Sequence, residues 1–317
     1  MGELITLIVL MVLATAVLAL VVYVAAKIVE RRNPPMGKFL EIDGTRLHYV
    51  ERGSGLPVVF LHGNGTMLQD FLLSEAFAST AKLNRAIAFD RPGFGYSSRP
   101  RARTWTASEQ ADLIAAALAR LNVGPAGLVG HSWGTLVAVA LAERHPALVR
   151  SLVLLSGYYY PAPRFDAALA VVGAMPVVGD VLRYTVTPLM GFIMLPFTLR
   201  AMFAPCLMTE QFGRRFPRLM MLRPWQLRAS LEDGAMMLPT AAALQPGYGD
   251  LQVPIIIAAG GEDRIVEPRQ SERLHREVHA SRLEILPGIG HMVHHSAPER
   301  VAAVINRAIA TIDVRAP

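Results

Sequence analysis

Apolar residues follow three different patterns along the chain, and each pattern predicts a different kind of structure. The first is an unbroken apolar run over residues 4–26, which has no charged side chain and only Thr6 and Thr15 as mildly polar ones. As an α-helix rising about 1.5 Å per residue, a run of this length crosses the roughly 30 Å hydrocarbon core of a bilayer. A buried helix of a soluble domain would carry a polar stripe, which this run lacks. The run therefore predicts a transmembrane helix.

The charges on either side of this run indicate how it is used. Glu3 is the only charged side chain before the run, whereas Lys27, Arg31, Arg32 and Lys38 follow it. A cleaved signal peptide would instead carry a basic segment before a shorter apolar core, so a retained anchor is favoured. Because positive residues concentrate on the cytoplasmic side of a span, we expect the rest of the chain to lie in the cytoplasm.

The second pattern is a series of short apolar runs separated by helix-favouring segments. Residues 39–42 and 47–50 flank Asp43-Gly44, a dipeptide that favours a tight hairpin turn. Continuous apolar runs typical of buried parallel strands follow at residues 57–61, 85–89, 126–129 and 149–155. Helices are predicted between them at residues 69–82, from a Ser108 cap to residue 120, and at 135–143. Strands and helices that alternate in this way predict a doubly wound, mostly parallel sheet with helices on both faces.

The third pattern interrupts this alternation. Residues 157–250 are rich in methionine, proline and arginine, and their apolar positions favour helices. The sheet pattern then resumes with strands at residues 254–258 and 282–286 and helices at 268–278 and 298–312. The middle segment is therefore expected to be a helical cap inserted into one α/β domain. The expected division is an anchor and linker at 1–38, the first part of the core at 39–156, the cap at 157–250 and the second part of the core at 251–317.

Composition adds a preference for membrane surfaces. Of the 317 residues, 52% are hydrophobic and 18% are charged, and the net charge is +6. Much of the positive charge is arginine beside apolar segments, and no nucleic-acid-binding motif is present, so a membrane is favoured as partner over nucleic acid. Cys206 is the only cysteine, which excludes an internal disulfide bond and a cysteine-based metal site. Neither a metal ion nor an organic cofactor is indicated.

The candidate chemistry centres on one pentapeptide, Gly130-His131-Ser132-Trp133-Gly134, which stands between a predicted strand and a predicted helix. In this setting G-x-S-x-G is typical of a nucleophile elbow, a sharp turn that holds a strained serine at the N-terminus of a helix. Glycine is expected at both ends because a Cβ there would collide with the neighbouring strand or helix. Ser132 is therefore the candidate nucleophile.

A serine hydroxyl needs a base to take its proton, and the base needs a group that orients it. His291 follows the last predicted strand, so we expect it at the same carboxyl edge of the sheet as Ser132. Asp263 follows the preceding strand and is the expected orienting acid, with its neighbour Glu262 as the fallback.

Acyl transfer also needs N–H donors aimed at the developing oxyanion. The backbone N–H of Trp133, directly after the nucleophile, is the first expected donor, and that of Asn64, in the glycine-rich loop after a strand, is the second. His62 is interpreted as a structural residue that supports this loop. We interpret His294 and His295, on the turn after the candidate base, as solvated or helix-capping residues.

Together these motifs resemble the α/β-hydrolase superfamily. The resemblance covers about residues 39–312 and rests on HGNG at 62–65, DRPGFG at 90–95, GHSWG at 130–134, GGEDRIV at 260–266 and GIGH at 288–291. It implies an eight-stranded sheet, and the chain order Ser132, Asp263, His291 matches the triad order of that superfamily. The turn at 90–95 is interpreted as structural support beside the site.

The chain also departs from relatives in that superfamily which use an aspartate nucleophile. Asn64 and Trp133 resemble the halide-binding pair of haloalkane dehalogenases, while epoxide hydrolases usually carry proline where this chain has Gly65. An aspartate forms an alkyl ester that water cleaves, whereas Ser132 would leave an ether that this machinery could not hydrolyse. Both activities are therefore disfavoured, and a serine with an oxyanion hole suits ester, thioester or amide hydrolysis, and less often cleavage of a C–C bond.

The expected function is a membrane-anchored serine hydrolase that cleaves a lipophilic carboxylic ester through an acyl-enzyme intermediate. One alternative is another chemistry on the same triad, either C–C bond hydrolysis or a cofactor-free haloperoxidase-like activity. The other is a catalytically idle binding module. The methionines of the cap are expected either to line an acyl pocket or to form the cap's own core. A basic stretch in the cap is either a solvated face or a contact with anionic headgroups; it comprises Arg214, Arg215, Arg218, Arg223 and Arg228.

Overall fold

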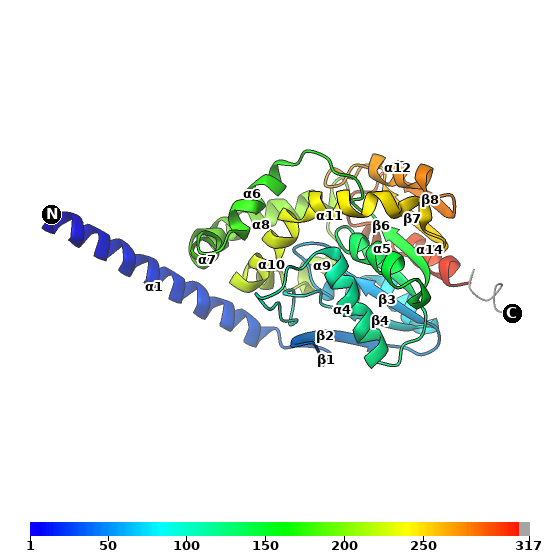
Figure 1. Cartoon of the computed structure of the whole chain (residues 1–317), viewed down its shortest axis with the longest axis horizontal. Coiled ribbons are helices and arrows are strands. Elements are labelled where there is room, and N and C mark those ends of the chain that lie inside the picture. The colour runs from blue at the N-terminus through cyan, green and yellow to red at the C-terminus, as the bar shows by residue number, and fades with distance from the viewer. Residues whose placement is uncertain (311–317) are drawn as a thin grey trace.

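Eight strands form one sheet in the order β1-β2-β4-β3-β5-β6-β7-β8 in the computed structural model, which describes residues 1–310 (Figure 1). The strands are β1 (Lys38–Ile42), β2 (Thr45–Arg52), β3 (Pro57–Leu61), β4 (Arg85–Phe89), β5 (Ala126–His131), β6 (Val149–Leu155), β7 (Ile255–Gly260) and β8 (Ser281–Leu286). β2 is antiparallel to both of its neighbours, and the strands from β4 to β8 in this order run parallel. The predicted sheet of eight mostly parallel strands is therefore confirmed.

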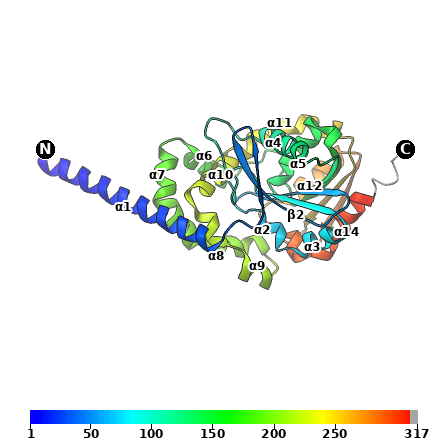
Figure 2. The same ribbon diagram turned by 90° about the horizontal axis from the view of Figure 1, so that it is seen from below.

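Helices cover both faces of this sheet, as predicted (Figures 1 and 2). One apolar core joins the sheet to α2 (Gln69–Leu72), α3 (Glu75–Leu83), α13 (Val293–Ser296) and α14 (Pro298–Ala310). The core on the other face joins it to α4 (Ala107–Arg120), α5 (Gly134–Arg144) and α12 (Arg269–Glu277), with the short turn η1 (Pro146–Leu148) after α5. Strands buried on both faces need apolar side chains on both, which explains the continuous apolar runs.

Two helix boundaries differ from the sequence prediction. The segment predicted as one helix over residues 69–82 is two helices, because Ser74 caps a new helix by accepting a hydrogen bond from that helix's backbone. The next helix is capped by Thr106, and the predicted cap at Ser108 is wrong. Thr106 and Glu109 each accept a hydrogen bond from the other's backbone N–H, a reciprocal arrangement that satisfies two donors at the helix start.

The insertion between β6 and β7 is helical, as predicted, and forms a cap over the sheet's carboxyl edge (Figure 1). Its helices are α6 (Phe165–Ala174), α7 (Val178–Tyr184), α8 (Val186–Phe203), α9 (Glu210–Arg215), η2 (Arg218–Leu222), α10 (Pro224–Ala235), α11 (Met237–Leu244) and η3 (Gln245–Asp250).

The cap has a small apolar core of its own, and some of its methionines help to form this core. Met202 and Met220 are buried in this core with Phe203, whereas Met190 and Met194 on α8 are about half exposed. The core also reaches the sheet, since Met67 from the loop after β3 and Met292 from the loop after β8 belong to the same cluster. α8 therefore packs directly against the two loops that flank the candidate site.

α1 (Gly2–Arg32) is one long helix whose N-terminal part projects from the body, while the rest packs against α7, η2 and α10 (Figures 1 and 2). Glu30 forms an ion pair with Arg223 at 2.7 Å, and the Tyr96 hydroxyl donates to backbone carbonyls at the end of the helix. The helix is thus fixed to the body by side chains as well as by the chain itself. Among the described residues, α1 and α8 are long and apolar enough to cross a membrane.

Glu143, at the C-terminal end of α5, makes the stability of the fold depend on pH. Burial, together with the nearby charge of Asp250, raises the pKa of Glu143 to about 7 from an ordinary value of 4.5. Its Oε1 atom has no hydrogen-bond partner within the described part of the chain. The unfolded chain therefore loses this proton at lower pH than the folded chain does. The folded state must then lose stability as the pH rises from about 4.5 to above 7.

Glu143→Gln should remove this loss, because the amide stays neutral at every pH. We expect the variant to melt at a higher temperature than the wild type at pH 8 and at nearly the same temperature at pH 5, in thermal melts followed by circular dichroism. An equal shift at both pH values would mean that ionisation of Glu143 is not the cause.

Candidate active site

The elbow has the geometry that its sequence predicts. Ser132 follows β5 directly, is partly exposed, and has a φ of +51°, a backbone conformation that side chains other than glycine rarely adopt. A Cβ on Gly130 would lie 2.7 Å from the carbonyl oxygen of Gly134, and one on Gly134 would lie 2.1 Å from that of Leu61. Both glycines are therefore required by close backbone packing, which holds the strained serine at the start of α5.

The candidate base and acid are paired with each other. Nδ1 of His291, in the loop after β8, lies 2.7 Å from Oδ2 of Asp263, in the loop after β7. The other carboxylate oxygen of Asp263 accepts hydrogen bonds from the backbone N–H groups of Ile265 and Val266, which fixes the side chain. Asp263 is buried while Glu262 is exposed, so the structure pairs His291 with the first-choice acid and not with the fallback.

The residue before Ser132 connects the elbow to this pair. Nε2 of His131 lies 3.1 Å from the carbonyl oxygen of His291, and because a carbonyl only accepts, the imidazole donates. The two rings also lie in contact, with centroids 4.8 Å apart. His131 therefore holds the loop that carries His291 against the residue next to the candidate nucleophile.

The loop after β3 approaches the elbow closely. A Cβ on Gly63 would lie 3.1 Å from the Cβ of Ser132, so glycine allows the loop to reach the serine. Within residues 1–310, the backbone N–H groups of Asn64 and Trp133 have no hydrogen-bond acceptor. The first lies on this loop and the second at the start of α5. Both are thus available to an oxyanion on a substrate at Ser132.

The side chains of these two residues have a different role, because both bind the cap. Nδ2 of Asn64 donates to the carbonyl of Ser230 at 3.0 Å, and Nε1 of Trp133 donates to the carbonyl of Asp233 at 3.0 Å. Both acceptors are on α10. A halide-binding pair would need these same N–H groups to point at the halide, so their use by α10 argues against dehalogenase chemistry.

Arg91, the second residue after β4, joins three parts of the site. Its fully buried guanidinium donates to the carbonyls of His62 and Gly63 in the oxyanion loop and forms an ion pair with Asp233 of α10 at 2.6 Å. It also lies over the ring of Trp133, 4.6 Å from the ring centroid. The turn at residues 90–95 is thus structural support, as the sequence predicted.

His62 supports the same loop and is not a second base. One ring nitrogen accepts a hydrogen bond from the backbone N–H of Arg91 at 3.0 Å, and the other donates to the carbonyl of Gly63 at 2.8 Å. Burial and the nearby charge of Arg91 lower the pKa of His62 to about 3, so the imidazole stays neutral. The prediction that it is structural is confirmed.

The interpretation of His294 and His295 as solvated or capping residues is wrong. Both side chains are buried, and each donates from Nε2 to the same carboxylate oxygen of Asp70 at 3.0 Å. Asp70 lies on α2, beyond the oxyanion loop, so it ties that segment to α13, which begins two residues after His291. No signal in the sequence indicates this contact. The two histidines stand where an exposed turn would fit equally well, and Asp70 lies more than 200 residues away and belongs to no motif.

The charge states in this cluster follow from its burial. Burial alone would raise the pKa of Asp70, but the attraction of His294 and the N–H donors of both histidines hold it well below its usual range. Burial lowers the pKa of His294 and of His131. The cluster is thus centred on a buried carboxylate that accepts hydrogen bonds from both histidines.

This cluster is also where the described residues could hold a metal ion. Asp70, His131 and His294 each offer a ligand atom, and the three atoms lie within 4.8 Å of one another. Carboxylate oxygen and imidazole nitrogen are ligands that suit zinc. One oxygen of Asp70 already accepts two hydrogen bonds, and we assign no ion to the group.

A strained serine after a parallel strand, a paired histidine and aspartate at the same edge, and a helical cap are the features of one fold family. A model of the α/β-hydrolase fold matches residues 57–298. The chain belongs to the α/β-hydrolase family.

Two curated relatives have named activities. A 2-hydroxymuconate semialdehyde hydrolase from Pseudomonas sp. strain CF600 is 33% identical over 156 residues, which are 48% of this chain and 54% of that protein. Haloalkane dehalogenase 2 of Mycobacterium tuberculosis strain H37Rv is 31% identical over 140 residues, 44% of this chain and 48% of that one. The chain spans about half the length of these relatives.

One solved structure aligns over almost the whole chain. It is a bacterial membrane phospholipase A described as a virulence factor, 20% identical, with a TM-score of 0.68 and 99% of both chains covered. At this identity the likeness concerns the fold alone.

Asp70→Asn should loosen the loop that carries His291, because an amide replaces the carboxylate that accepts from two histidines. Hydrogen bonds to a charged group contribute about 1.5–3 kcal/mol each, so we expect unfolding free energy to fall by at least about 2 kcal/mol in urea titrations. The matched control is Asp112→Asn, which weakens partly exposed pairs with Arg144 and His145 and should cost less than about 1 kcal/mol. Equal effects of the two substitutions would contradict a supporting role for Asp70.

Proposed function

We propose that the chain is a membrane-anchored serine hydrolase that cleaves a lipophilic carboxylic ester. The single observation that carries the proposal is the strained, partly exposed Ser132, whose chain neighbour His131 contacts the His291 of a buried His291–Asp263 pair. Strain at a non-glycine residue is maintained only where the surroundings force it, and here the close backbone packing of two glycines does so. The carboxyl edge of a parallel sheet is also where α/β proteins place their reactive groups.

In this proposal each residue has one role. His291 takes the proton of the Ser132 hydroxyl as the oxygen attacks the ester carbonyl, and later gives that proton to the leaving alkoxide. Asp263 holds the imidazole by accepting from Nδ1–H and stabilises its positive charge. The backbone N–H groups of Asn64 and Trp133 stabilise the oxyanion. Water then hydrolyses the acyl-enzyme with the same base.

The membrane part of the proposal rests on α1 and the charges around it. The helix is apolar from residue 4 to residue 26, and the basic residues that follow it favour a single span with the catalytic body on the cytoplasmic side. A lipophilic substrate partitions into the bilayer, so an enzyme anchored in the same bilayer meets this substrate at a higher local concentration than an enzyme in water would.

The second candidate is hydrolysis of a C–C bond in a diketone-like substrate on the same triad. The curated relatives support this alternative better than ester cleavage, because one of them is a 2-hydroxymuconate semialdehyde hydrolase. The other relative is a dehalogenase, and that activity is disfavoured by a serine nucleophile and by the engagement of the Asn64 and Trp133 side chains with α10.

A substrate panel distinguishes the two candidates. We expect purified full-length protein in detergent to hydrolyse p-nitrophenyl esters, with kcat/KM rising from short to medium acyl chains, and to leave a vinylogous diketone unchanged. Ser132→Ala should lower ester hydrolysis by about 10⁴-fold or more, as loss of a catalytic nucleophile does. Cleavage of the diketone with no ester hydrolysis would favour the second candidate.

Ser156→Ala is the matched control for this experiment. Ser156 also follows a parallel strand and has a positive φ, of 46°, but its hydroxyl is buried and makes no hydrogen bond within the described residues. The variant should keep activity within a few-fold of the wild type.

A further inference from the structure

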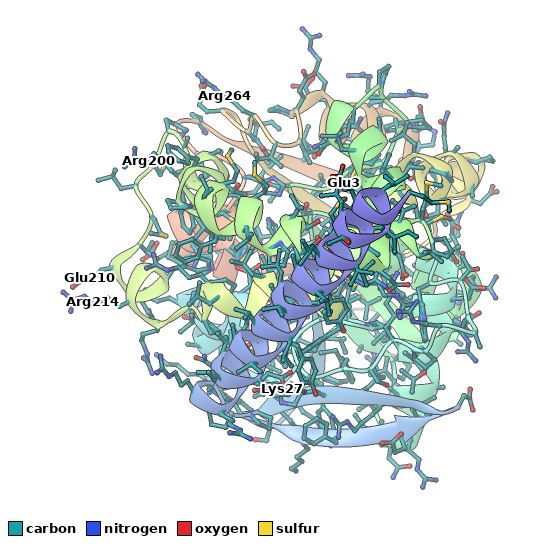
Figure 3. All side chains as sticks on the ribbon, turned by 90° about the vertical axis from the view of Figure 1, so that its left-hand side faces the viewer. Glu3, Lys27, Arg200, Glu210, Arg214 and Arg264 are labelled. Carbon is teal, nitrogen blue, oxygen red and sulfur yellow. The ribbon has the colours of Figure 1, made fainter. Side chains whose placement is uncertain are left out.

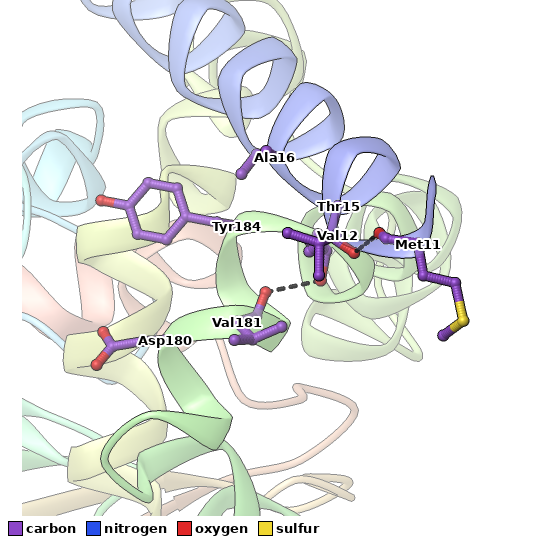
Figure 4. A pocket seen from close by; sticks show the side chains of 9 residues that line it. Met11, Val12, Thr15, Ala16, Asp180, Val181 and Tyr184 are labelled. Atoms are coloured by element: carbon purple, nitrogen blue, oxygen red, sulfur yellow. Dashed lines mark hydrogen bonds between the residues drawn. The ribbon is translucent and has the colours of Figure 1, made fainter. Parts of the chain in front are cut away.

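The cap lies beside the middle of the apolar run of α1. A cleft of about 550 Å³ is lined on one side by Met11, Thr15 and Ala19 of α1 and on the other by Val181 and Tyr184 of α7 (Figure 4). Farther along, a second groove separates α1 from α8 and η2; its lining includes Val22, Val29, Leu189, Phe192 and Leu222. Two cap helices, α7 and α8, therefore lie beside α1.

The length of the run fixes the depth of this contact. A bilayer core needs about 20 helical residues, so a window of that size within residues 4–26 starts no later than residue 7 and ends no earlier than residue 23. Every such window contains residues 11–19, which face α7. A tilt of the helix only lengthens the part inside the core. If α1 crosses a bilayer, α7 must lie at the depth of the hydrocarbon.

The outward surface of the cap helices has the composition that hydrocarbon requires. Large apolar side chains from α6, α7 and α8 are about half exposed or more; they are Leu169, Val171, Val172, Val178, Val181, Val186, Leu189, Met190, Phe192, Ile193, Met194 and Phe197. Between residues 167 and 199 the only charged side chains are Asp180 and Arg183, which form an ion pair with each other. Soluble monomers rarely expose this many large apolar side chains on helices that pack against one another, as α6 does on α7 and α7 on α8.

Exposed basic side chains border this surface. Figure 3 views the molecule from the side toward which α1 projects, with Arg200 and Arg214 at the left of the view and Lys27 on α1 itself. Arg31 and Arg32 end α1. An apolar face bordered by cations complements a bilayer with anionic headgroups, whose surface attracts each nearby lysine or arginine by about 1 kcal/mol.

α8 does not fit a second independent span. Leu195, Leu199 and Phe203 on its C-terminal half are buried against Met67 and Met292. The N-terminal half and Phe197 present apolar side chains outward, so one side of α8 packs on the protein and the other side is exposed.

We infer that α6, α7 and the N-terminal half of α8 are embedded in the hydrocarbon of the same bilayer that α1 crosses. The cap is thus part of the membrane-bound body of the enzyme, and α1 is not a tether to a domain in water. The inference rests on the anchor in the proposed function, and it adds the phospholipid bilayer as the partner of the cap.

Fluorescence quenching in vesicles tests this directly on the full-length chain. Cys206→Ser provides a background without cysteine, and single cysteines at Phe192, Val181, Val9 and Leu83 carry an environment-sensitive dye. Val9 reports the span itself. Leu83, at the end of α3, is the matched control, because it is an apolar side chain 69% exposed on an element that packs against α2, α13, α14 and β4. The protein is reconstituted in phosphatidylcholine and phosphatidylglycerol.

We expect nitroxides on the lipid acyl chains to quench positions 192 and 181 as strongly as position 9. Aqueous iodide, which hydrocarbon excludes, should quench them about fivefold less than position 83. Quenching of 192 and 181 by iodide, as at 83, would overturn the inference while leaving the anchor intact. Protection from both quenchers would mean that a second copy of the chain covers this face, which would also overturn it.

The unmodified chain provides a second measurement that no substitution can disturb. A phospholipid with a photoactivatable group in mid-chain should crosslink to residues 167–197 as well as to α1, as mapped by mass spectrometry. Crosslinks confined to α1 would overturn the inference. Labelling of Ser132 by a fluorophosphonate, measured on the same samples, reports separately whether the proposed chemistry holds.

Discussion

The close approach of three backbone segments at the elbow is the constraint on which the rest of the site depends. β3 pairs with β5 so that Leu61 lies opposite Gly130, and α5 begins against the carbonyl of Leu61 with no room for a Cβ on Gly134. This contact forces the positive φ of Ser132 and starts the oxyanion loop next to it. The register of the sheet and the packing of the backbone therefore bring the nucleophile close to the oxyanion loop, without any contribution from side-chain contacts.

Buried polar groups then fix the loops that the sheet only brings near. Arg91 holds the oxyanion loop to α10, and Asp70 holds the segment after that loop to the histidines that follow His291. Breaking a buried pair by removing one partner costs about 3–5 kcal/mol, so each network fixes one arrangement of its loops. The Asp233 partner of Arg91 lies in the cap, which makes the cap part of the site's framework as well as its cover.

The sequence was sufficient for the features that have a local cause. Strands, helices and the elbow follow from periodicity, glycine positions and motif spacing, and the order of Ser132, Asp263 and His291 places all three at one edge. The partners of Asp70, Arg91 and Asn64 could not be predicted, because they lie between about 140 and 225 residues away and a buried carboxylate or arginine looks like an exposed one in the sequence. For the same reason, burial of His294 and His295 was missed. The apolar cap was visible in the sequence, but its position beside residues 11–19 of α1 required the fold.

Covalent labelling of the full-length protein tests most directly whether Ser132 is an acyl-transfer nucleophile. A fluorophosphonate should form one adduct per chain, and mass spectrometry should map it to Ser132. His291→Gln should slow its formation strongly while the protein stays folded. A folded wild type that forms no adduct, or an adduct on another residue that persists in Ser132→Ala, would contradict this role of Ser132.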